Sequence, residues 1–287
     1  MRWLVIGGTG LVGRYLIPLL AGCGHVVHVV SRNPAAVPGG AVTILADVSD
    51  RDWVAPLTQN YDVVCHMAYA TTEEEEYNRA VTVQSVIDLL QHFQKVRLQH
   101  FIYLGSMAVF GEMTPYAQNK LEASQAVLKA SVPFRVTVLH PTGVYDADSK
   151  RMRDYRAMFE DGYIAAPADG ITNIVHADDV AGAIVTSASR TMGARAEEYI
   201  INGESLSYRE WFAVIERKAG VDTWPKLPPW LSPFIRGPVA KLARKLRVRK
   251  ALPIPAYKLA AYRAKMTFSS ERAEQDFGFS PQRRLLL

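Results

Sequence analysis

The sequence has little cysteine and no long hydrophobic run. Its two cysteines, Cys23 and Cys65, belong to no CxxC or metal-ligand pattern, and both sit among apolar residues. We therefore predict two buried thiols, a reducing compartment and no bound metal. The longest apolar stretch, 11–21, is too short to cross a bilayer and contains Arg14 and Pro18. Because a strand pattern starts at Arg2 and leaves no room for a signal peptide, we expect a cytoplasmic protein.

The sequence also lacks a strong excess of charge of either sign. Lys and Arg number 33 and Asp and Glu 28, so the formal net charge is +5, while hydrophobic residues make up 49% of the 287 residues. This balance is ordinary for a globular chain with one large domain, or one large and one small. The mild excess of positive charge suits a phosphate-bearing small molecule and does not indicate nucleic acid.

Short apolar runs alternate with helical patterns through the first half. Runs that read apolar on both faces, separated by helices, predict a doubly wound parallel sheet of the Rossmann type, an α/β fold. The expected strands are 3–8, 25–31, 42–46, 61–68, 100–105 and 134–140, and the expected helices are 11–22, 81–95 and 116–130.

After about residue 145 the pattern loosens. We assign 1–145 to a dinucleotide-binding domain, with further strands from about 172–201, and 146–287 mainly to a small, irregular C-terminal α/β lobe that binds substrate. In this lobe Ser207 and Glu210 have the spacing of a capping box at a helix start, and Gly220 ends the helix pattern.

A glycine loop follows the first strand directly. Gly7, Gly10 and Gly13 have GxxGxxG spacing and open a helix pattern. Glycine permits the tight turn and the close approach of a pyrophosphate to the N–H groups of the helix start. A plain tight turn is the alternative, but the position between strand and helix favours dinucleotide binding.

The residues that follow the second and third strands bear on the choice of coenzyme. The second strand ends in Ser31, Arg32 and Asn33, and none of the three is acidic. An acid at this place binds the ribose 2′-hydroxyl of NAD, whereas an arginine suits the 2′-phosphate of NADP. Arg32 therefore favours NADP, with NAD as the alternative. Arg32 could also be a solvated residue stacking on adenine, and Arg14 is a candidate second phosphate contact. Asp47, followed by Val48, either accepts a hydrogen bond from adenine or caps a helix.

Tyr116 and Lys120 are four residues apart in a predicted helix, and Ser106 ends the fifth strand. An i, i+4 pair shares one helix face, and a nearby ammonium lowers the pKa of a tyrosine hydroxyl. Such a pair can exchange a proton with a carbinol or carbonyl group, and the serine can hold the substrate oxygen. Alone the YxxxK spacing is weak, because many exposed helices carry it.

Combined, these motifs resemble the extended short-chain dehydrogenase/reductase superfamily, and more closely its NAD-dependent epimerase/dehydratase family. Further segments resemble the family in the expected order along nearly the whole chain. They are "HMAYA" (66–70), "YLGSMAVFGE" (103–112), "HPTGVYD" (140–146), "NIVHADDVAGAI" (173–184) and "FSSERAEQDFGFSPQ" (268–282).

The resemblance implies a role for each matching residue. Tyr116 would be the general acid/base, Lys120 would lower its pKa and hold the nicotinamide ribose, and Ser106 would orient the substrate oxygen. The coenzyme would be held by the glycine loop and by residues from the following strand ends, namely Gly7, Thr9, Gly10, Leu11, Val12, Gly13, Arg14, Ser31, Arg32, Asp47, Val48, Met67, Ala68, Tyr116, Lys120, Pro141 and Val144.

The chain departs from the family pattern in places that bear on the substrate. Only nine residues separate Ser106 from Tyr116, fewer than extended members usually have. Thr82 and Ser85 stand where the family often has Asn and Gly, and His140 stands where arginine is common. These changes leave the substrate open and the redox residues intact.

These observations leave three candidate functions, of which two are enzymatic and one is not. The first is net oxidation or reduction of a carbinol or ketone with an exchangeable coenzyme, which Arg32 favours. The second is a nucleotide-sugar epimerase or dehydratase that retains its NAD. The third, a dinucleotide sensor without turnover, is disfavoured by the presence of Tyr116 and Lys120.

The remaining charged motifs have plainer interpretations. The basic segment 236–250 predicts either weak contact with an anionic membrane surface or a solvated helix. Four consecutive glutamates at 73–76 predict a solvated loop or a helix start, and Asp178 or Asp179 a helix cap rather than a metal site with His176. A homodimer is a further expectation from the family resemblance.

Overall fold

The protein was analysed as a computed structural model that describes residues 1–50, 52–147, 149–160, 163–164, 170–189, 195–218, 220, 250–251 and 264–285. The chain forms two compact units. Unit 1 comprises Met1–Val144, Val175–Asn202 and Ser269–Gln282, and unit 2 comprises Tyr145–Ile174, Gly203–Phe268 and Arg283–Leu287. The return of 269–282 to unit 1 is a feature that the sequence pattern does not indicate.

Unit 1 is built on a seven-stranded sheet of order β10-β6-β5-β4-β1-β2-β3, in which every neighbouring pair is parallel. The order reverses between β1 and β4, and this switch point is where ligands bind in doubly wound folds. The predicted fold class is confirmed. The strands are β1 (Arg2–Ile6), β2 (Val26–Ser31), β3 (Ala41–Leu45), β4 (Val63–His66), β5 (His100–Leu104), β6 (Arg135–Pro141) and β10 (Ala196–Ile201).

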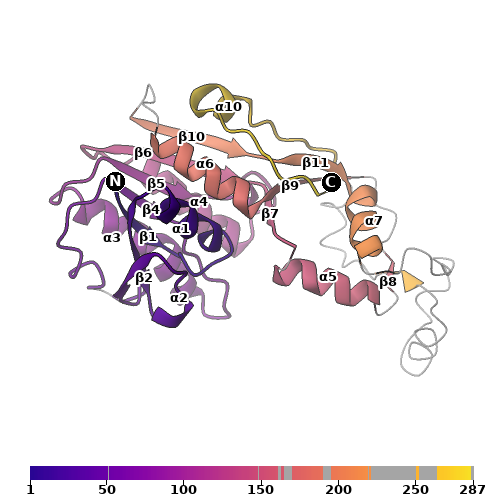
Figure 1. Ribbon diagram of the computed structural model, residues 1–287, viewed down its shortest axis with the longest axis horizontal. Helices are drawn as coiled ribbons and strands as arrows, with labels where there is room; N and C mark the ends of the chain where they lie inside the picture. The colour runs from indigo at the N-terminus through magenta and orange to yellow at the C-terminus, as the bar shows by residue number, and fades with distance from the viewer. Residues whose placement is uncertain are drawn as a thin grey trace. The chain divides into compact units, whose positions relative to one another are not determined.

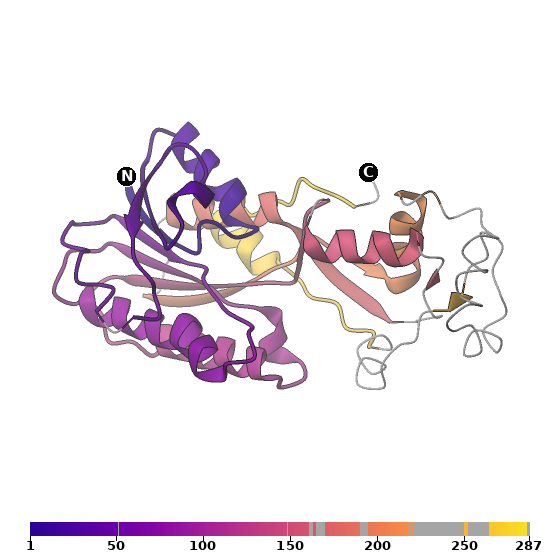
Figure 2. The ribbon, with the colours of Figure 1, turned by 90° about the horizontal axis from the view of Figure 1, so that it is seen from below.

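Helices cover both faces of this sheet, as Figures 1 and 2 show. On one face α1 (Gly13–Gly22), α6 (Ala177–Ser189) and α10 (Glu271–Phe277) bury apolar side chains such as Leu16, Ile184 and Phe277. On the other face α3 (Ser85–His92) and α4 (Pro115–Leu128) bury Val86 and Val127 among others. Burial on both sides explains the continuous apolar runs of the strands.

The helical run before α3 starts earlier than predicted. It comprises α2 (Glu75–Arg79), a π-helical segment at Ala80–Gln84 and then α3. Glu75 and Glu76 lie in the first turn of α2, where the helix dipole favours negative charge. Of the two predictions for the four glutamates, a solvated loop or a helix start, the helix start is confirmed. Short 3₁₀ segments lie at Pro34–Ala36 and Met107–Phe110.

The two cysteines differ in burial. Cys65 lies in β4 and is buried, and burial raises the pKa of its thiol. Cys23 follows the last turn of α1 and is exposed, so the prediction of two buried thiols is wrong for Cys23. The reason is that the chain leaves the sheet surface at the end of α1.

The described part of unit 2 contains helices α5 (Lys150–Glu160) and α7 (Tyr208–Lys218) and most of a three-stranded sheet of order β11-β9-β7. The strands of this sheet are β7 (Gly143–Tyr145), β9 (Ile171–His176) and β11 (Glu204–Ser207), of which β7 and β9 each cross a unit boundary, and β8 (Tyr163–Ile164) pairs with β12 (Lys250–Ala251). A separate core includes Trp211, Phe212 and Ile174.

The predicted capping box is confirmed at the start of α7. The Ser207 hydroxyl oxygen accepts from the Glu210 N–H (3.2 Å), and the Glu210 carboxylate accepts from the Ser207 N–H (2.8 Å). Hydrogen bonds from Ser207 lower the pKa of Glu210. All of the basic segment 236–250 except Lys250 lies outside the described residues. None of the helices in the described part of the chain combines the length and apolar character that crossing a bilayer requires.

Candidate active site

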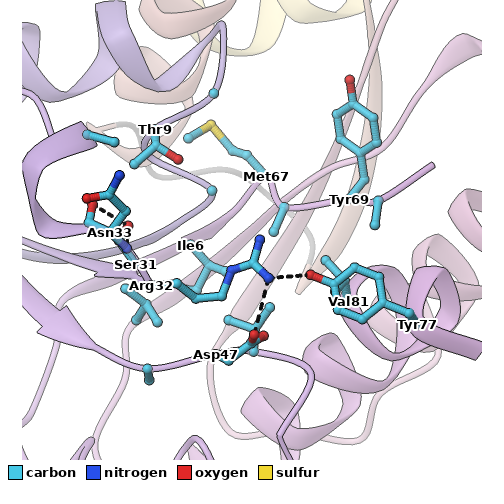
Figure 3. A pocket seen from close by; sticks show the side chains of 18 of the residues that line it. Ile6, Thr9, Ser31, Arg32, Asn33, Asp47, Met67, Tyr69, Tyr77 and Val81 are labelled. Atoms are coloured by element: carbon cyan, nitrogen blue, oxygen red, sulfur yellow. Dashed lines mark hydrogen bonds and ion pairs between the residues drawn. The ribbon is translucent and has the colours of Figure 1, made fainter. Parts of the chain in front are cut away.

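A pocket of about 770 Å³ lies at the carboxyl ends of β1, β2, β3 and β4 in unit 1 (Figure 3). Nine of the predicted coenzyme residues line it, namely Gly7, Thr9, Gly10, Ser31, Arg32, Asp47, Val48, Met67 and Ala68. The lining also includes Tyr69 and Ala70, from the 66–70 segment that resembles the family, and residues that sequence reasoning did not assign to the site, which are Ile6, Val30, Asn33, Ala36, Ala46, Thr71, Thr72, Glu74, Tyr77 and Val81.

The other predicted coenzyme residues lie outside the lining of this pocket. Val12 turns its side chain into the core beside α1, and Arg14 is exposed on the first turn of that helix. Pro141 ends β6 and is buried, and Val144 packs against the core from β7. Leu11 and Gly13 belong to the loop and helix start, and Tyr116 and Lys120 belong to α4.

The glycine loop needs glycine for two separate reasons. Gly7 has φ of 85°, in the left-handed region, and a Cβ there would lie 2.6 Å from the backbone nitrogen of Ala68. A Cβ on Gly13 would lie 2.1 Å from the carbonyl oxygen of Gly8. Larger residues would therefore fill the space that brings β1, the β4 segment and α1 together. The loop backbone lies at the pocket wall, which fits the approach of a pyrophosphate.

Arg32 projects over the pocket between two oxygen groups, as Figure 3 shows. Its Nη1 donates to the Tyr77 hydroxyl (2.7 Å) and to the Asp47 carboxylate (3.3 Å). Tyr77 and then Asp47 raise the pKa of Arg32. Because the Arg32 side chain is 64% exposed, solvent screens the ion pair and leaves the guanidinium accessible to a ligand.

The Asp47 carboxylate accepts hydrogen bonds from Ser49 as well as from Arg32. Its Oδ1 accepts from the Ser49 N–H (3.0 Å) and from the Ser49 hydroxyl (2.7 Å). Partial burial raises its pKa, but the hydrogen bonds from Ser49 and the charge of Arg32 outweigh burial, so the net pKa is lowered. The carboxylate is thus held ionised at the pocket wall.

Ser106, Tyr116 and Lys120 lie at the same edge of the sheet. Ser106 follows β5 and caps the 3₁₀ segment, accepting from the Ala108 N–H (3.1 Å), and its side chain has a lowering effect on the pKa of Tyr116. Thr114 caps α4 and so places Tyr116 in the first turn. Lys120 is only 2% exposed, and its Nζ donates to the Leu104 carbonyl (2.8 Å).

Burial dominates the charges of this pair. It raises the pKa of Tyr116, against the lowering effect of Ser106, and it lowers the pKa of Lys120 to about 7. We predicted a lowered pKa for Tyr116 beside Lys120, but the net shift of the Tyr116 pKa is upward. The physical reason is that both groups lose hydration, and hydration favours their charged forms.

His140, in the place of the family's usual arginine, supports the Ser106 segment. It is buried, its Nδ1 lies 3.3 Å from the Ser106 carbonyl, and its Nε2 lies 3.1 Å from the Glu198 carboxylate. Burial outweighs Glu198 and lowers the pKa of His140. A Cβ at Gly105 would lie 2.7 Å from its ring, so the glycine admits the imidazole.

Thr82 and Ser85, the other departures from the family pattern, connect the π-helical segment to β4. The Ser85 hydroxyl lies 2.8 Å from His66 Nε2 and donates to the Val81 carbonyl (2.6 Å). The Ala70 N–H donates to the Thr82 hydroxyl (3.3 Å). These contacts tie the segment that carries the pocket residues Met67 and Ala68 to the helix beside it.

The described residues contain no group of three or more His, Cys, Asp or Glu side chains that could hold a metal ion. His176 Nδ1 accepts from the Asp178 N–H (3.1 Å), and the Asp179 carboxylate accepts from the Gln282 N–H (2.8 Å). His176 therefore supplies an acceptor at the start of α6, and Asp179 ties down the segment after α10.

Comparison with known proteins gives matches over most of the chain. The profile of the NAD dependent epimerase/dehydratase family matches residues 3–201. A 3 beta-hydroxysteroid dehydrogenase/Delta 5-->4-isomerase of Mycobacterium tuberculosis is 26% identical over 330 residues, covering 98% of this chain and 86% of that protein. A 4-hydroxy-2-methyl-3-oxo-4-farnesyl-3,4-dihydroquinoline-1-oxide ketoreductase of Stigmatella aurantiaca is 23% identical, covering 98% and 92%.

Solved structures show the same fold. The UDP-glucose 4-epimerase of Thermotoga maritima has a TM-score of 0.75 at 16% identity, covering 99% of this chain and 95% of that one. The UDP-glucuronic acid 4-epimerase of Bacillus cereus, solved with NAD, has a TM-score of 0.74 at 17% identity with the same coverage. At these identities the likeness shows the fold alone.

Proposed function

Because the chain belongs to the NAD-dependent epimerase/dehydratase family, and is an enzyme of the extended short-chain dehydrogenase/reductase type, we propose that Tyr116, Lys120 and Ser106 carry its chemistry. The observation that carries this assignment is the buried Lys120 one turn after Tyr116 on α4, with its Nζ tied to the Leu104 carbonyl (2.8 Å) at the sheet edge that also holds the pocket.

The residues at the pocket fit a dinucleotide. The Gly7 and Gly13 backbone leaves a cradle that a Cβ would fill, and the positive Arg32 lies at the end of β2 where the ribose of such a ligand is bound. Bound there, NAD(P) supplies the hydride donor or acceptor at nicotinamide C4. The chain's own residues supply position and the proton.

In the reductive direction the Tyr116 hydroxyl gives its proton to the substrate oxygen. The Ser106 hydroxyl, which lies at the end of β5, donates to that oxygen and holds it within reach. Protonated Lys120 stabilises the phenolate that remains, and in oxidation the same atoms act in reverse. His140 fixes the backbone carbonyl of Ser106 and so keeps the serine in place.

For the coenzyme we propose NADP in preference to NAD. Arg32 supports this choice, because an exposed guanidinium is a good partner for a 2′-phosphate and no acid occupies the end of β2. Asp47 disfavours NADP, because its carboxylate already accepts a hydrogen bond from Arg32 and would repel the 2′-phosphate. NAD is the alternative, and NAD is bound in the Bacillus cereus epimerase.

For the substrate we propose an uncharged, largely apolar alcohol or ketone undergoing net redox. Three exposed apolar side chains, Tyr69, Phe110 and Met113, lie on the segments that flank Tyr116 in sequence or space. The curated relatives described above are named for a hydroxysteroid and for a farnesylated quinoline oxide, both largely apolar. The second candidate, a nucleotide-sugar epimerase or dehydratase with retained NAD, is favoured by the fold of the solved structures.

One experiment separates these candidates. Freshly purified protein is denatured and any released dinucleotide is identified by mass spectrometry. Net redox predicts little bound coenzyme, followed by NADPH consumption with apolar ketones that Tyr116→Phe abolishes. Stoichiometric NAD, with no turnover of free coenzyme, would contradict the redox proposal and support the epimerase. The homodimer and the cytoplasmic location stay predictions.

A further inference from the structure

Lys120 lies between two aromatic rings. Its Nζ is 4.9 Å from the ring centroid of Tyr103 and 5.3 Å from that of Tyr69. Tyr103 is in β5 and fully buried, whereas Tyr69 follows β4 and is 56% exposed. Both distances are within the range in which the face of an aromatic ring attracts a cation.

Tyr69 also contacts the other member of the catalytic pair. Its ring packs edge-on against Tyr116, with centroids 5.5 Å apart and planes at 67°. Figure 3 shows Tyr69 across the pocket from Arg32 and Asp47, with its hydroxyl directed away from them. One exposed side chain thus joins the coenzyme pocket to both Tyr116 and Lys120.

We propose that Tyr69 is a positioning residue, whose ring holds the ammonium of Lys120 beside Tyr116 and so keeps the pair ready for proton transfer. This inference rests on the proposed function, because it assigns Tyr69 a task only if Tyr116 and Lys120 carry the chemistry. It goes beyond that function by naming the residue on which their charge state depends.

The physical need for such a residue follows from burial. Burial lowers the pKa of Lys120 to about 7, so its ammonium is only partly populated at neutral pH. The Leu104 carbonyl and the two rings favour the charged form. A cation–π contact at a partly exposed ring shifts such an equilibrium by roughly threefold to thirtyfold.

Other titratable groups nearby do not replace the ring. Burial and then the charge of Lys120 lower the pKa of His66 in β4 to about 3, and burial and Lys120 also lower the pKa of His140 in β6, so both imidazoles are neutral beside Lys120. The pKa of the Tyr103 hydroxyl is raised well above its usual value, so it too stays neutral. Tyr69 differs from Tyr103 in being exposed, and it can be changed without opening the core.

The test compares Tyr69→Leu with Tyr69→Phe. The first removes the ring, and the second keeps the ring and removes only the hydroxyl. The titration of Lys120 is followed by NMR in protein with ¹³C-labelled lysine, using Lys120→Met to assign the resonance. Phe110→Leu is the control for the NMR titration alone, because it removes a ring of similar exposure, 52%, whose recorded ring contact is with His140 and not with Lys120.

We expect Tyr69→Leu to lower the pKa of Lys120, to decrease kcat about tenfold, and to move the basic limb of the oxidation pH profile to lower pH. Tyr69→Phe should restore all three, and Phe110→Leu should leave the Lys120 titration at the wild-type value. An unchanged Lys120 titration in Tyr69→Leu, or equal impairment by Tyr69→Phe, overturns the proposal. Full activity of Tyr116→Phe would instead overturn the proposed function, and the NMR titration would still report on Tyr69.

Discussion

The two cations of the candidate site, Arg32 and Lys120, are held in opposite ways. Arg32 is exposed, and Tyr77 and Asp47 raise its pKa. Lys120 is buried, and burial lowers its pKa to about 7. An exposed cation keeps its charge at any physiological pH and serves as a fixed binding group. A buried cation has a charge that its neighbours decide, which suits a group that must assist proton transfer.

The strongest challenge to this contrast is Lys120→Met, which removes the buried cation at similar volume. We expect kcat to fall roughly 10²–10⁴-fold, because the phenolate of Tyr116 loses its stabilising charge. Steady-state kinetics with the apolar substrate measure the effect. Lys129→Met, at the exposed end of the same helix, is the control. A kcat equal to that of wild type would remove Lys120 from the mechanism.

The same variant tests the cost of burying Lys120. Between pH 7 and 10.5 the unfolded chain binds a proton at this lysine that the folded chain has lost. Over that interval the free energy of unfolding of the wild type should therefore rise by on the order of a few kcal/mol more than that of Lys120→Met. Urea denaturation at a series of pH values measures the difference between the two proteins. Identical pH dependence would show that Lys120 is hydrated and ordinary.

Gly13→Ala tests the loop from which the coenzyme pocket is built. The new Cβ would lie 2.1 Å from the Gly8 carbonyl, so the loop or α1 must shift. We expect a loss of about 1–3 kcal/mol in the free energy of unfolding and weaker dinucleotide binding. Gly22→Ala in the same helix, whose Cβ meets nothing within 4 Å, should be neutral or stabilising by up to ~1 kcal/mol. Equal behaviour of the two variants would contradict the close-packing argument.

The smallest effects are expected at the exposed cation. Arg32→Ala should weaken NADPH binding about tenfold and hardly change NADH binding, because only the phosphate contact is lost. Asp47→Asn should strengthen NADPH binding a few-fold by removing a competing carboxylate. Isothermal titration with both coenzymes measures each affinity. An equal loss of NADH and NADPH affinity in Arg32→Ala would mean that Arg32 contacts adenine or ribose instead.

Elements with a local signal could be predicted from the sequence. The parallel sheet follows from strands apolar on both faces, the glycine loop from its position after β1, and the start of α7 from the spacing of Ser207 and Glu210. Tyr77 was missed as a pocket residue, and Tyr69 was not singled out within the 66–70 segment, because the contacts of both depend on where a strand end and a helix meet other elements. The sign of the Tyr116 pKa shift was wrong for a related reason, since burial is a property of the packed fold.

The return of the chain to unit 1 has a consequence for synthesis. Unit 1 is assembled from three separate stretches of sequence, and the last contributes Phe277, which is fully buried in the core beside α1 and α6. A ribosome delivers this residue after the two longer stretches of unit 2, Tyr145–Ile174 and Gly203–Phe268, have been made. The core that supports the glycine loop therefore cannot close during translation of the first half, and shortening the chain before Phe277 would leave it open.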